Sequence, residues 1–359
     1  MTANAIVGTP NLLFLGAGAS KPYGLKLMGE FVQSFRQRYA TPVAPATLLE
    51  AICGKNEDLE FLIEELDALS TRDYLEDQRS LSAVVGLVGG SGWRWPEFQK
   101  LAVEARELLA SLKREVYMHY RSIPDPAETD LLARPIELLK DGSHPMVVFT
   151  TNYDPAVEDF CARQNFRLTD GFSRDRQMRT EVWNRKNFDK FALPEPGTAD
   201  ALEQSLILFK LHGSAEWFKK QDRIVKSQPT YDNNDPDYHN VMIYPATRKV
   251  AIEEPYFTAY DYLEQCLDEA KSCLAIGYSF RDYDALMRFK SAKLSNNHLQ
   301  IIVLDPKANA VCEYLKGYGI VAYPLQYHFG GDQVPKYLQR ISVYLQGKSH
   351  AGVEHAQSG

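Results

Sequence analysis

Two polar segments that directly follow apolar runs could carry chemistry, and they contain His212 and Asn152. His212 lies in the segment KLHGS (210–214), directly after the apolar run SLILF. An imidazole titrates near neutral pH, so a histidine at a strand end is suited to act as a general base. Asn152 lies in TTNYDP (150–155), directly after the apolar run MVVF. A lone histidine is more often structural, and Asp154 before a proline also suits a helix N-cap.

Two further segments follow apolar runs and contain glycine: GAGAS (16–20) and GYSFRD (277–282). Glycine lets a backbone approach a phosphate closely, and a following helix offers free N–H groups and a positive dipole end. The first segment matches only half of the dinucleotide fingerprint, because Lys21 stands at its third glycine position. The first segment fits a tight turn without a ligand equally well, and in the second segment Asp282 also fits the cap of the next helix.

The elements that must position these residues alternate between apolar runs and helical patterns. Strands are predicted at 11–15, 146–149, 205–211, 272–276, 299–304 and 319–322, and helices at 154–162, 256–271, 282–294, 308–317 and 333–346. This alternation predicts an α/β fold with a Rossmann-like, doubly wound parallel sheet, whose ligands gather at the carboxyl ends of the strands. The polar stretches 171–204 and 219–240 are predicted to be loops or mobile lids.

Residues from about 46 to 140 interrupt this pattern with apolar residues at helical spacing. Helices are predicted at 57–69, 96–122 and 129–140, and we interpret the stretch as a helical insertion module. A helix with one apolar face is also expected from Met28 to Tyr39. The chain is therefore expected to form one domain over 1–347, followed by a flexible tail at 348–359.

Composition restricts the class of protein. The net charge of −7 argues against a broad nucleic-acid surface, so no direct nucleic-acid binding is expected. No apolar run reaches the roughly 18 residues that span a membrane, and the first residues do not form a signal peptide. The five cysteines form no CxxC pair, which is typical of reduced thiols. A cytoplasmic protein is expected.

Taken in order, GAGAS, TTNYD, KLHGS, GYS and a strand that ends at Asp305 resemble the NAD-binding core of the sirtuins. The resemblance covers about residues 11–30, 145–160, 205–220 and 270–310, and it is closest to the sirtuin-like proteins of bacterial anti-phage defence. It implies that Asn152 holds the nicotinamide ribose and positions a water, and that His212 acts as the general base. The other NAD contacts that it implies are Gly16, Ala17, Gly18 and Ser20 at the pyrophosphate, Thr151, Asp154 near the nicotinamide, Gly277 and Ser279 at phosphate or adenosine ribose, and Asp305 near the adenosine.

The sequence also departs from the sirtuin deacylases. Their zinc ribbon uses two cysteine pairs between the histidine and the later Gly-Ser motif, whereas only Cys266 and Cys273 occur in that interval here. A tetrahedral zinc site needs four ligands, so no zinc and no other metal is expected. The segment KPYGLKLM lacks the Phe-Arg pair of the deacylases, which argues against an acyl-lysine peptide as substrate.

The resemblance therefore implies an NAD+ glycohydrolase that acts as the effector of an anti-phage defence system. Because constant loss of NAD harms the host, a separate trigger is expected: homo-oligomer assembly, or an activating protein such as a HerA-type ATPase or an Argonaute-like protein. One alternative is a module that only senses NAD or ADP-ribose and need keep neither Asn152 nor His212. Another is a protein ADP-ribosyl or deacyl transferase.

Overall fold

The computed structural model describes residues 6–39, 48–49, 52, 59–70, 95–175, 180–188, 204–220, 222–226, 239–240 and 253–346. They form two compact units. The sheet unit contains the described residues up to Leu25 and from Ile123 onward, and the helical unit contains those from Lys26 to Ser122. The tail predicted to be flexible, 348–359, lies outside the described residues.

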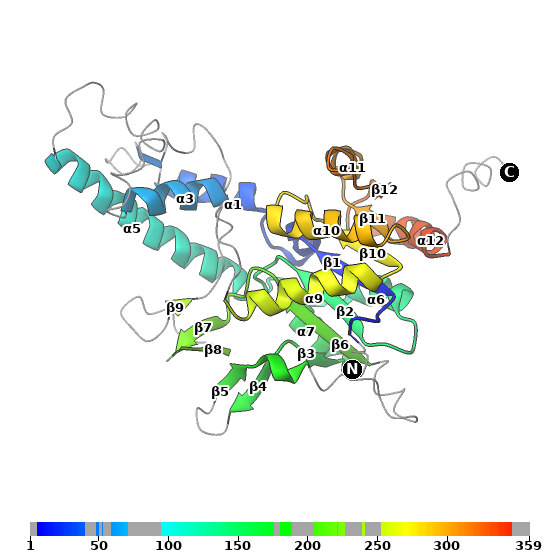
Figure 1. Cartoon of the computed structure of the whole chain (residues 1–359). Helices are drawn as coiled ribbons and strands as arrows, with labels where there is room; N and C mark the ends of the chain where they lie inside the picture. The colour runs from blue at the N-terminus through cyan, green and yellow to red at the C-terminus, as the bar shows by residue number, and fades with distance from the viewer. Residues whose placement is uncertain are drawn as a thin grey trace. The chain divides into compact units, whose positions relative to one another are not determined.

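The sheet unit is built on a seven-stranded sheet in which every neighbouring pair is parallel (Figure 1). In spatial order its strands are β12 (Ala322–Leu325), β11 (Gln300–Leu304), β10 (Ser272–Ile276), β1 (Asn11–Leu15), β2 (Met146–Thr150), β6 (Ser205–Lys210) and β3 (Arg167–Thr169). The chain runs from β1 to β2 and on to the edge strand β3, returns to β6 between β2 and β3, and then continues with β10 on the other side of β1. The predicted doubly wound fold is confirmed, and its switch point lies between β1 and β10.

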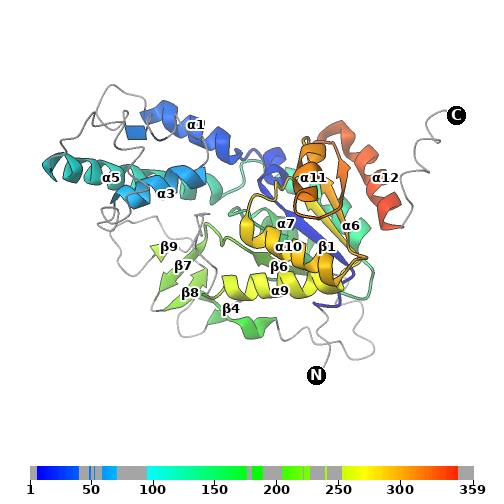
Figure 2. The ribbon, with the colours of Figure 1, turned by 45° about the horizontal axis from the view of Figure 1, so that its top comes forward.

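Helices cover both faces of this sheet (Figure 2). One face is covered by α9 (Tyr256–Glu269), α10 (Tyr283–Ser295) and α11 (Ala308–Lys316). The other is covered by α6 (Ala133–Leu139), α7 (Ala156–Gln164) and α12 (Val334–Leu345), together with the 3-10 helices η1 (Ala17–Tyr23) and η3 (Pro126–Leu132). Because both faces are buried, the central strands read as continuous apolar runs.

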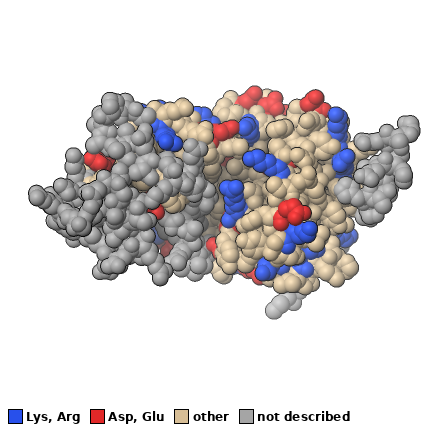
Figure 3. Space-filling model, turned by 90° about the horizontal axis from the view of Figure 1, so that it is seen from above, with Lys and Arg blue, Asp and Glu red and all other residues tan. Residues whose placement is uncertain are grey.

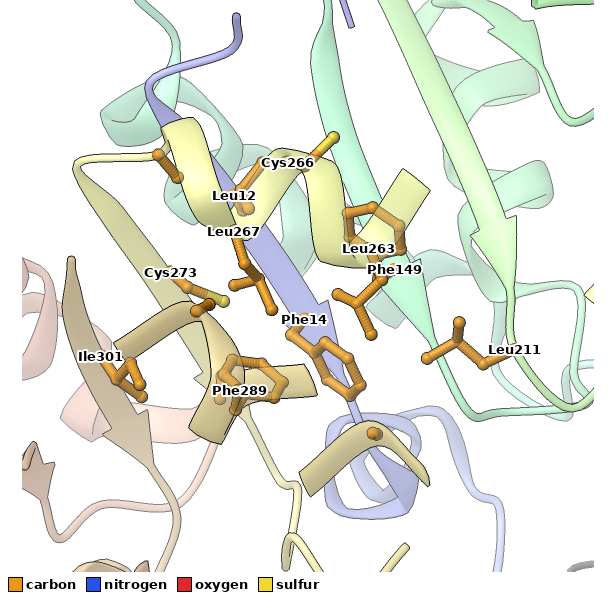
Figure 4. Close-up of a cluster of buried hydrophobic side chains, with 14 of the residues drawn as sticks. Leu12, Phe14, Phe149, Leu211, Leu263, Cys266, Leu267, Cys273, Phe289 and Ile301 are labelled. Atoms are coloured by element: carbon orange, nitrogen blue, oxygen red, sulfur yellow. The ribbon is translucent and has the colours of Figure 1, made fainter. Parts of the chain in front are cut away.

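Successive side chains of β1 enter the two different cores. Leu12 and Phe14 pack toward α9 and α10, whereas Leu13 and Leu15 pack toward α6 and α7. In Figure 4, Phe14 lies between Phe149 of β2 and Phe289 of α10. Interior strands of this kind hold their carboxyl ends in fixed positions, which is what a site at those ends requires.

A second sheet of five antiparallel strands occupies part of the stretches predicted to be loops or lids. In order, its strands are β4 (Phe172–Asp175), β5 (Thr180–Trp183), β8 (Arg223–Lys226), β7 (Trp217–Lys220) and β9 (His239–Asn240), and the 3-10 helix η4 (Arg185–Asn187) follows β5. The loop prediction is wrong for these residues. Their charged residues are paired: Nζ of Lys226 in β8 lies 3.0 Å from Oδ2 of Asp170 and 3.9 Å from Oε2 of Glu216.

The helical unit contains α1 (Met28–Tyr39), α3 (Leu59–Ser70) and α5 (Trp95–Tyr120), close to the bounds that the sequence predicts. The division between the units differs from the predicted insertion at about 46–140, because α1 belongs to the helical unit while η3 and α6 belong to the sheet unit. The reason is packing: Ile136 and Leu139 of α6 are buried against strand residues of the parallel sheet.

Strand β12 lies three residues later than the predicted strand at 319–322, so that prediction is wrong in register. Gly319 has φ +80° and forms the turn before the strand, a conformation that a β-strand does not use. Pro324 lies within β12, which is tolerated because β12 is at the edge of the sheet.

The surface shown in Figure 3 carries acidic and basic side chains side by side, in keeping with the modest net charge of −7. Within the ranges that the structure describes, no helix combines the length and apolar character needed to cross a membrane.

Candidate functional site

The carboxyl ends of four neighbouring strands are level with one another. Leu15 pairs with both Thr150 and Ile276, and Thr150 pairs with Lys210. The four segments that follow these ends, which contain the residues singled out from the sequence, therefore begin side by side along one edge. Strands in a sheet are about 4.8 Å apart, so the four ends span about 14 Å, a width suited to a small ligand.

Gly16, Gly18 and Gly277 form a close backbone contact at the switch point. The N–H of Gly16 donates to Ile276 O, and that of Gly18 donates to Gly277 O, each over 2.9 Å. A Cβ on Gly16 would lie 2.5 Å from Gly277 O, and one on Gly277 would lie 2.3 Å from Ala19 N. Because the N–H groups of Gly16 and Gly18 donate within the protein, other groups at this edge must supply donors to a phosphate. The pyrophosphate contact of these glycines stays a prediction.

We expect Gly277→Ala to lower the free energy of unfolding by about 2–4 kcal/mol, through its backbone conformation and overpacking. Gly277 has φ +61°, and the atoms that its new Cβ would meet belong to the backbone of Gly18 and Ala19. Chemical denaturation measures the loss. Gly142→Ala is the matched control, because Gly142 has φ +75° but nothing within 4 Å of a Cβ. Equal losses in the two variants would contradict the close packing.

Asn152 belongs to a polar cluster on the α7 side of the strand ends. Its Nδ2 donates to Gly16 O over 2.9 Å and to Ser20 Oγ over 2.8 Å. Ser20 Oγ in turn donates to Asp154 Oδ2 over 2.8 Å. Both hydrogens of Nδ2 are thus used, and no residue that the structure describes donates to Oδ1 of Asn152. The amide oxygen is therefore the atom that can accept a hydrogen bond from a ligand.

Asp154 connects this cluster to the start of α7. Its Oδ1 accepts the N–H of Ala156, the first residue of α7, over 3.1 Å. The N-cap position of α7 is Pro155, so the predicted N-cap at Asp154 with Pro155 as the first helical residue is one residue too early. Burial raises the pKa of Asp154, while the charge of Lys210 and the hydrogen bond from Ser20 oppose the rise. The side chain is almost fully buried, so it orients Ser20 and through it the Asn152 amide.

Lys210, the last residue of β6, connects the end of β6 to the segment that follows β2 and to helix α7. Its Nζ donates to the backbone oxygen of Asp154 over 2.7 Å and to Ser214 Oγ over 3.2 Å, and it lies 2.8 Å from Oε1 of Glu158. The Lys210 side chain is 1% exposed, so this amine is fully removed from water. From the sequence, Lys210 is visible only as part of the motif KLHGS, and no role could be predicted for it because the motif does not show that the amine is buried.

His212 is held by a carboxylate on the α9 and α10 side of the strand ends. Its Nε2 lies 2.9 Å from Oδ2 of Asp282, and the hydroxyl of Tyr260 donates to the same oxygen over 3.0 Å. Oδ1 of Asp282 accepts the N–H groups of Asp284 and Ala285, so the predicted cap of α10 is confirmed. Neither the contact of Asp282 with His212 nor the hydrogen bond from Tyr260 to Asp282 was predicted from the sequence.

The carboxylate of Asp282 stays charged at neutral pH. Burial acts to raise its pKa, but the hydrogen bond and charge of His212, with donors from Ala285 and Tyr260, lower the pKa below its ordinary value. Burial raises the pKa of Tyr260, and the nearby charge of Asp282 raises it further. Tyr260 therefore remains a hydrogen-bond donor.

The remaining predicted site residues lie at the same edge but are more open. Ala17 and Thr151 are partly exposed and Ser279 is exposed. Asp305 follows β11, beside β10, and its Oδ1 accepts the N–H of Lys307 over 2.7 Å. Their NAD contacts stay predictions. In the described ranges no three His, Cys, Asp or Glu side chains are grouped so that they could hold a metal ion.

A cavity of about 620 Å³ lies at the antiparallel sheet, away from these residues. Its walls include Trp183, Lys219, Arg223 and Glu253, and none of the predicted site residues lines it. The candidate site is therefore defined by the aligned strand ends and their hydrogen bonds, and the cavity is a separate feature of the sheet unit.

Comparison with known proteins agrees with the motifs. Residues 146–323 match the family model described as the SIR2-like domain. No match was found among the curated proteins. Similar solved structures include a Sir2 homologue in complex with NAD (12% identity, 94% of this chain and 93% of that chain, TM-score 0.42), a mutant Sir2 homologue in complex with ADP-ribose (11%, 96% and 97%, 0.44), and Sir2 bound to an acetylated peptide (11%, 95% and 94%, 0.36).

The matched range contains the ends of β2, β6 and β10, and with them Asn152, His212 and Asp282. The glycine segment after β1 precedes it and packs directly against Gly277 within it. The family match and the order of motifs along the aligned strand ends identify this chain as a member of the SIR2-like, or sirtuin-like, family.

Proposed function

We propose that this protein is an NAD+ glycohydrolase, which converts NAD+ and water to nicotinamide and ADP-ribose. The observation that carries the proposal is the alignment of the β2 and β6 ends within the SIR2-like domain, which brings Asn152 and His212 to one edge of the sheet. Oδ1 of Asn152 and Nδ1 of His212 form no hydrogen bond with any residue that the structure describes, so both atoms are available to a ligand. A module that only bound NAD would need neither side chain.

The reaction breaks the bond between C1′ of the ribose and the nicotinamide nitrogen, and the bonding electron pair leaves with nicotinamide. The oxygen of a water molecule forms the new bond to C1′ and gives up one proton. As in other glycoside hydrolyses, the transition state resembles an oxocarbenium ion. The protein must therefore hold the ribose, orient one water and accept one proton.

The residues of the site fit these three tasks. Oδ1 of Asn152 can accept a hydrogen bond from the water or from a ribose hydroxyl, because its amide nitrogen is fixed by Gly16 and Ser20. The imidazole of His212 can accept the proton, directly or through a ribose hydroxyl. The partly exposed backbone at Ala17 and the exposed hydroxyl of Ser279 are the groups at the switch point that remain available to the pyrophosphate.

We further propose that the protein acts in the cytoplasm as the effector of an anti-phage defence system, and that a partner protein or oligomer assembly switches it on. Unrestrained NAD hydrolysis would harm the cell that makes the enzyme, so a trigger is needed. The helical unit is the natural candidate for contact with a partner. Its helix α5 leaves Val103 and Met118 about half exposed.

The test is to incubate the purified protein with NAD+, alone and with the protein encoded beside it in the genome, and to quantify nicotinamide and ADP-ribose by chromatography. Equimolar appearance of both products supports the glycohydrolase. Activity only in the mixture supports the trigger. If NAD+ binds, measured by calorimetry, but remains intact in every mixture, the glycohydrolase proposal fails and the sensor alternative takes its place. Transfer of ADP-ribose to protein would instead indicate a transferase.

A further inference from the structure

The two nitrogens of the His212 ring have different surroundings. Nε2 faces the Asp282 carboxylate at 2.9 Å. No described residue forms a hydrogen bond with Nδ1. Because an ionised carboxylate only accepts hydrogen bonds, the proton of a neutral His212 must lie on Nε2, and Nδ1 is left with a free lone pair.

Asp282 is itself held firmly, which makes it suited to fix another side chain. Its Oδ1 accepts two backbone N–H groups of α10, and its Oδ2 accepts the hydroxyl of Tyr260. Tyr260 is held in turn by Arg288, whose guanidinium lies 4.5 Å from the centre of the tyrosine ring and whose Nε donates to the Tyr260 backbone oxygen over 3.3 Å. An N-cap needs only one carboxylate oxygen, so capping alone does not explain why the second oxygen has two side-chain donors.

We infer that Asp282 is a positioning residue that holds His212 with its proton on Nε2, so that Nδ1 accepts the proton from water or from a ribose hydroxyl. Tyr260 keeps the Asp282 carboxylate in place. When Nδ1 takes up the proton, the imidazolium that forms lies against the charged carboxylate. This inference rests on the glycohydrolase proposed above, and it adds to it the identity of the proton-accepting atom and the group that selects it.

Asp282→Asn tests the inference because asparagine is also a good N-cap. With its Oδ1 still bound to the backbone of α10, its Nδ2 becomes a donor toward His212, and the proton of the ring must move to Nδ1. The unprotonated, basic nitrogen is then Nε2, which faces residue 282 and not the proposed substrate. In a Ser-His-Asp hydrolase the same reversal lowers kcat about 10,000-fold, so we expect a loss of about 1,000- to 10,000-fold with KM nearly unchanged.

The position of the proton is measured independently of catalysis. Nitrogen-15 NMR of the histidine rings distinguishes the two tautomers, and the His212 signals are those absent from His212→Gln. We expect the Nε2–H form in the natural protein and the Nδ1–H form in Asp282→Asn. Asp284→Asn is the matched control, since Asp284 lies in the same turn of α10 but its side chain makes no hydrogen bond to His212. It should keep both the tautomer and kcat.

Tyr260→Phe provides a second variant that leaves the helix cap intact. Loss of one donor to the buried carboxylate should lower kcat about tenfold, which corresponds to about 1.4 kcal/mol. The inference is overturned if the natural protein carries its proton on Nδ1, or if Asp282→Asn folds and keeps its kcat. If the tautomer reverses as expected but no variant and not even the natural protein hydrolyses NAD+, the positioning role stands and the proposed glycohydrolase fails.

Discussion

Asn152→Ala should lower the rate of NAD+ hydrolysis about 100- to 1,000-fold, the effect of removing one preorganised group that stabilises a transition state. The substitution removes Oδ1, the atom that can hold the water or the ribose. It also removes the two hydrogen bonds from Nδ2 to Gly16 and Ser20. Because Asn152 is only partly buried, the loss of folding stability should stay near 1 kcal/mol, and the protein should remain folded.

His212→Ala should have an effect at least as large, because the substitution removes the imidazole that is proposed to accept the proton. Initial rates of nicotinamide release measure both variants, and circular dichroism shows whether they are folded. Asn297→Ala is the control, since Asn297 is exposed and precedes β11 at the opposite edge of the sheet. Hydrolysis at the natural rate in both Asn152→Ala and His212→Ala would contradict the assignment of the site.

Lys210→Met should lower the free energy of unfolding by about 3–5 kcal/mol, the range seen when one partner of a buried ion pair is removed. The variant keeps the length of the side chain but leaves the Glu158 carboxylate, which is 11% exposed, without its cation. It also leaves the acceptors at Asp154 and Ser214 unpaired. Denaturant unfolding, followed by fluorescence, measures the change.

Two comparisons separate the ion pair from a general effect of losing a lysine. The double variant Lys210→Met with Glu158→Leu should recover part of the lost stability, because no buried charge is then left unpaired. Lys316→Met removes a lysine from an exposed pair with Glu313 and should change stability by at most about 1 kcal/mol. A Lys210 variant as stable as the Lys316 variant would show that the buried pair between β6 and α7 does not stabilise the fold.

The positions of Asn152 and His212 could be predicted because each directly follows a buried apolar run, and strand ends of a parallel sheet meet at one edge. The partner of His212 could not. Asp282 is 70 residues away in the sequence, and its strand β10 is three strands away from β6 in the sheet. Apolar runs give the existence of strands but not their spatial order, so only the cap formed by Asp282 was visible in the sequence.

The antiparallel sheet could not be predicted from the sequence either, because its pairing also joins segments that are far apart in the chain. Its strands are four residues long, apart from the two-residue β9, and they carry charged residues at many positions, which is also typical of loops. Their stability comes from pairing across the sequence: β5, which precedes β6, pairs with β8, which follows it. A pairing between two insertions leaves no local periodicity.

The central pairing of β1 with β10 also sets the order in which this protein can mature during translation. Leu12 aligns with Val147 of β2 and with Cys273 of β10, so β1 waits for the second of its two neighbours until 261 residues later. At about 5–20 residues per second this wait lasts roughly 13–50 seconds. A nascent chain that has not reached Asp282 has neither the second half of the glycine contact nor the partner of His212. If the protein consumes NAD+ as proposed, the activity begins only after the ribosome has added Asp282.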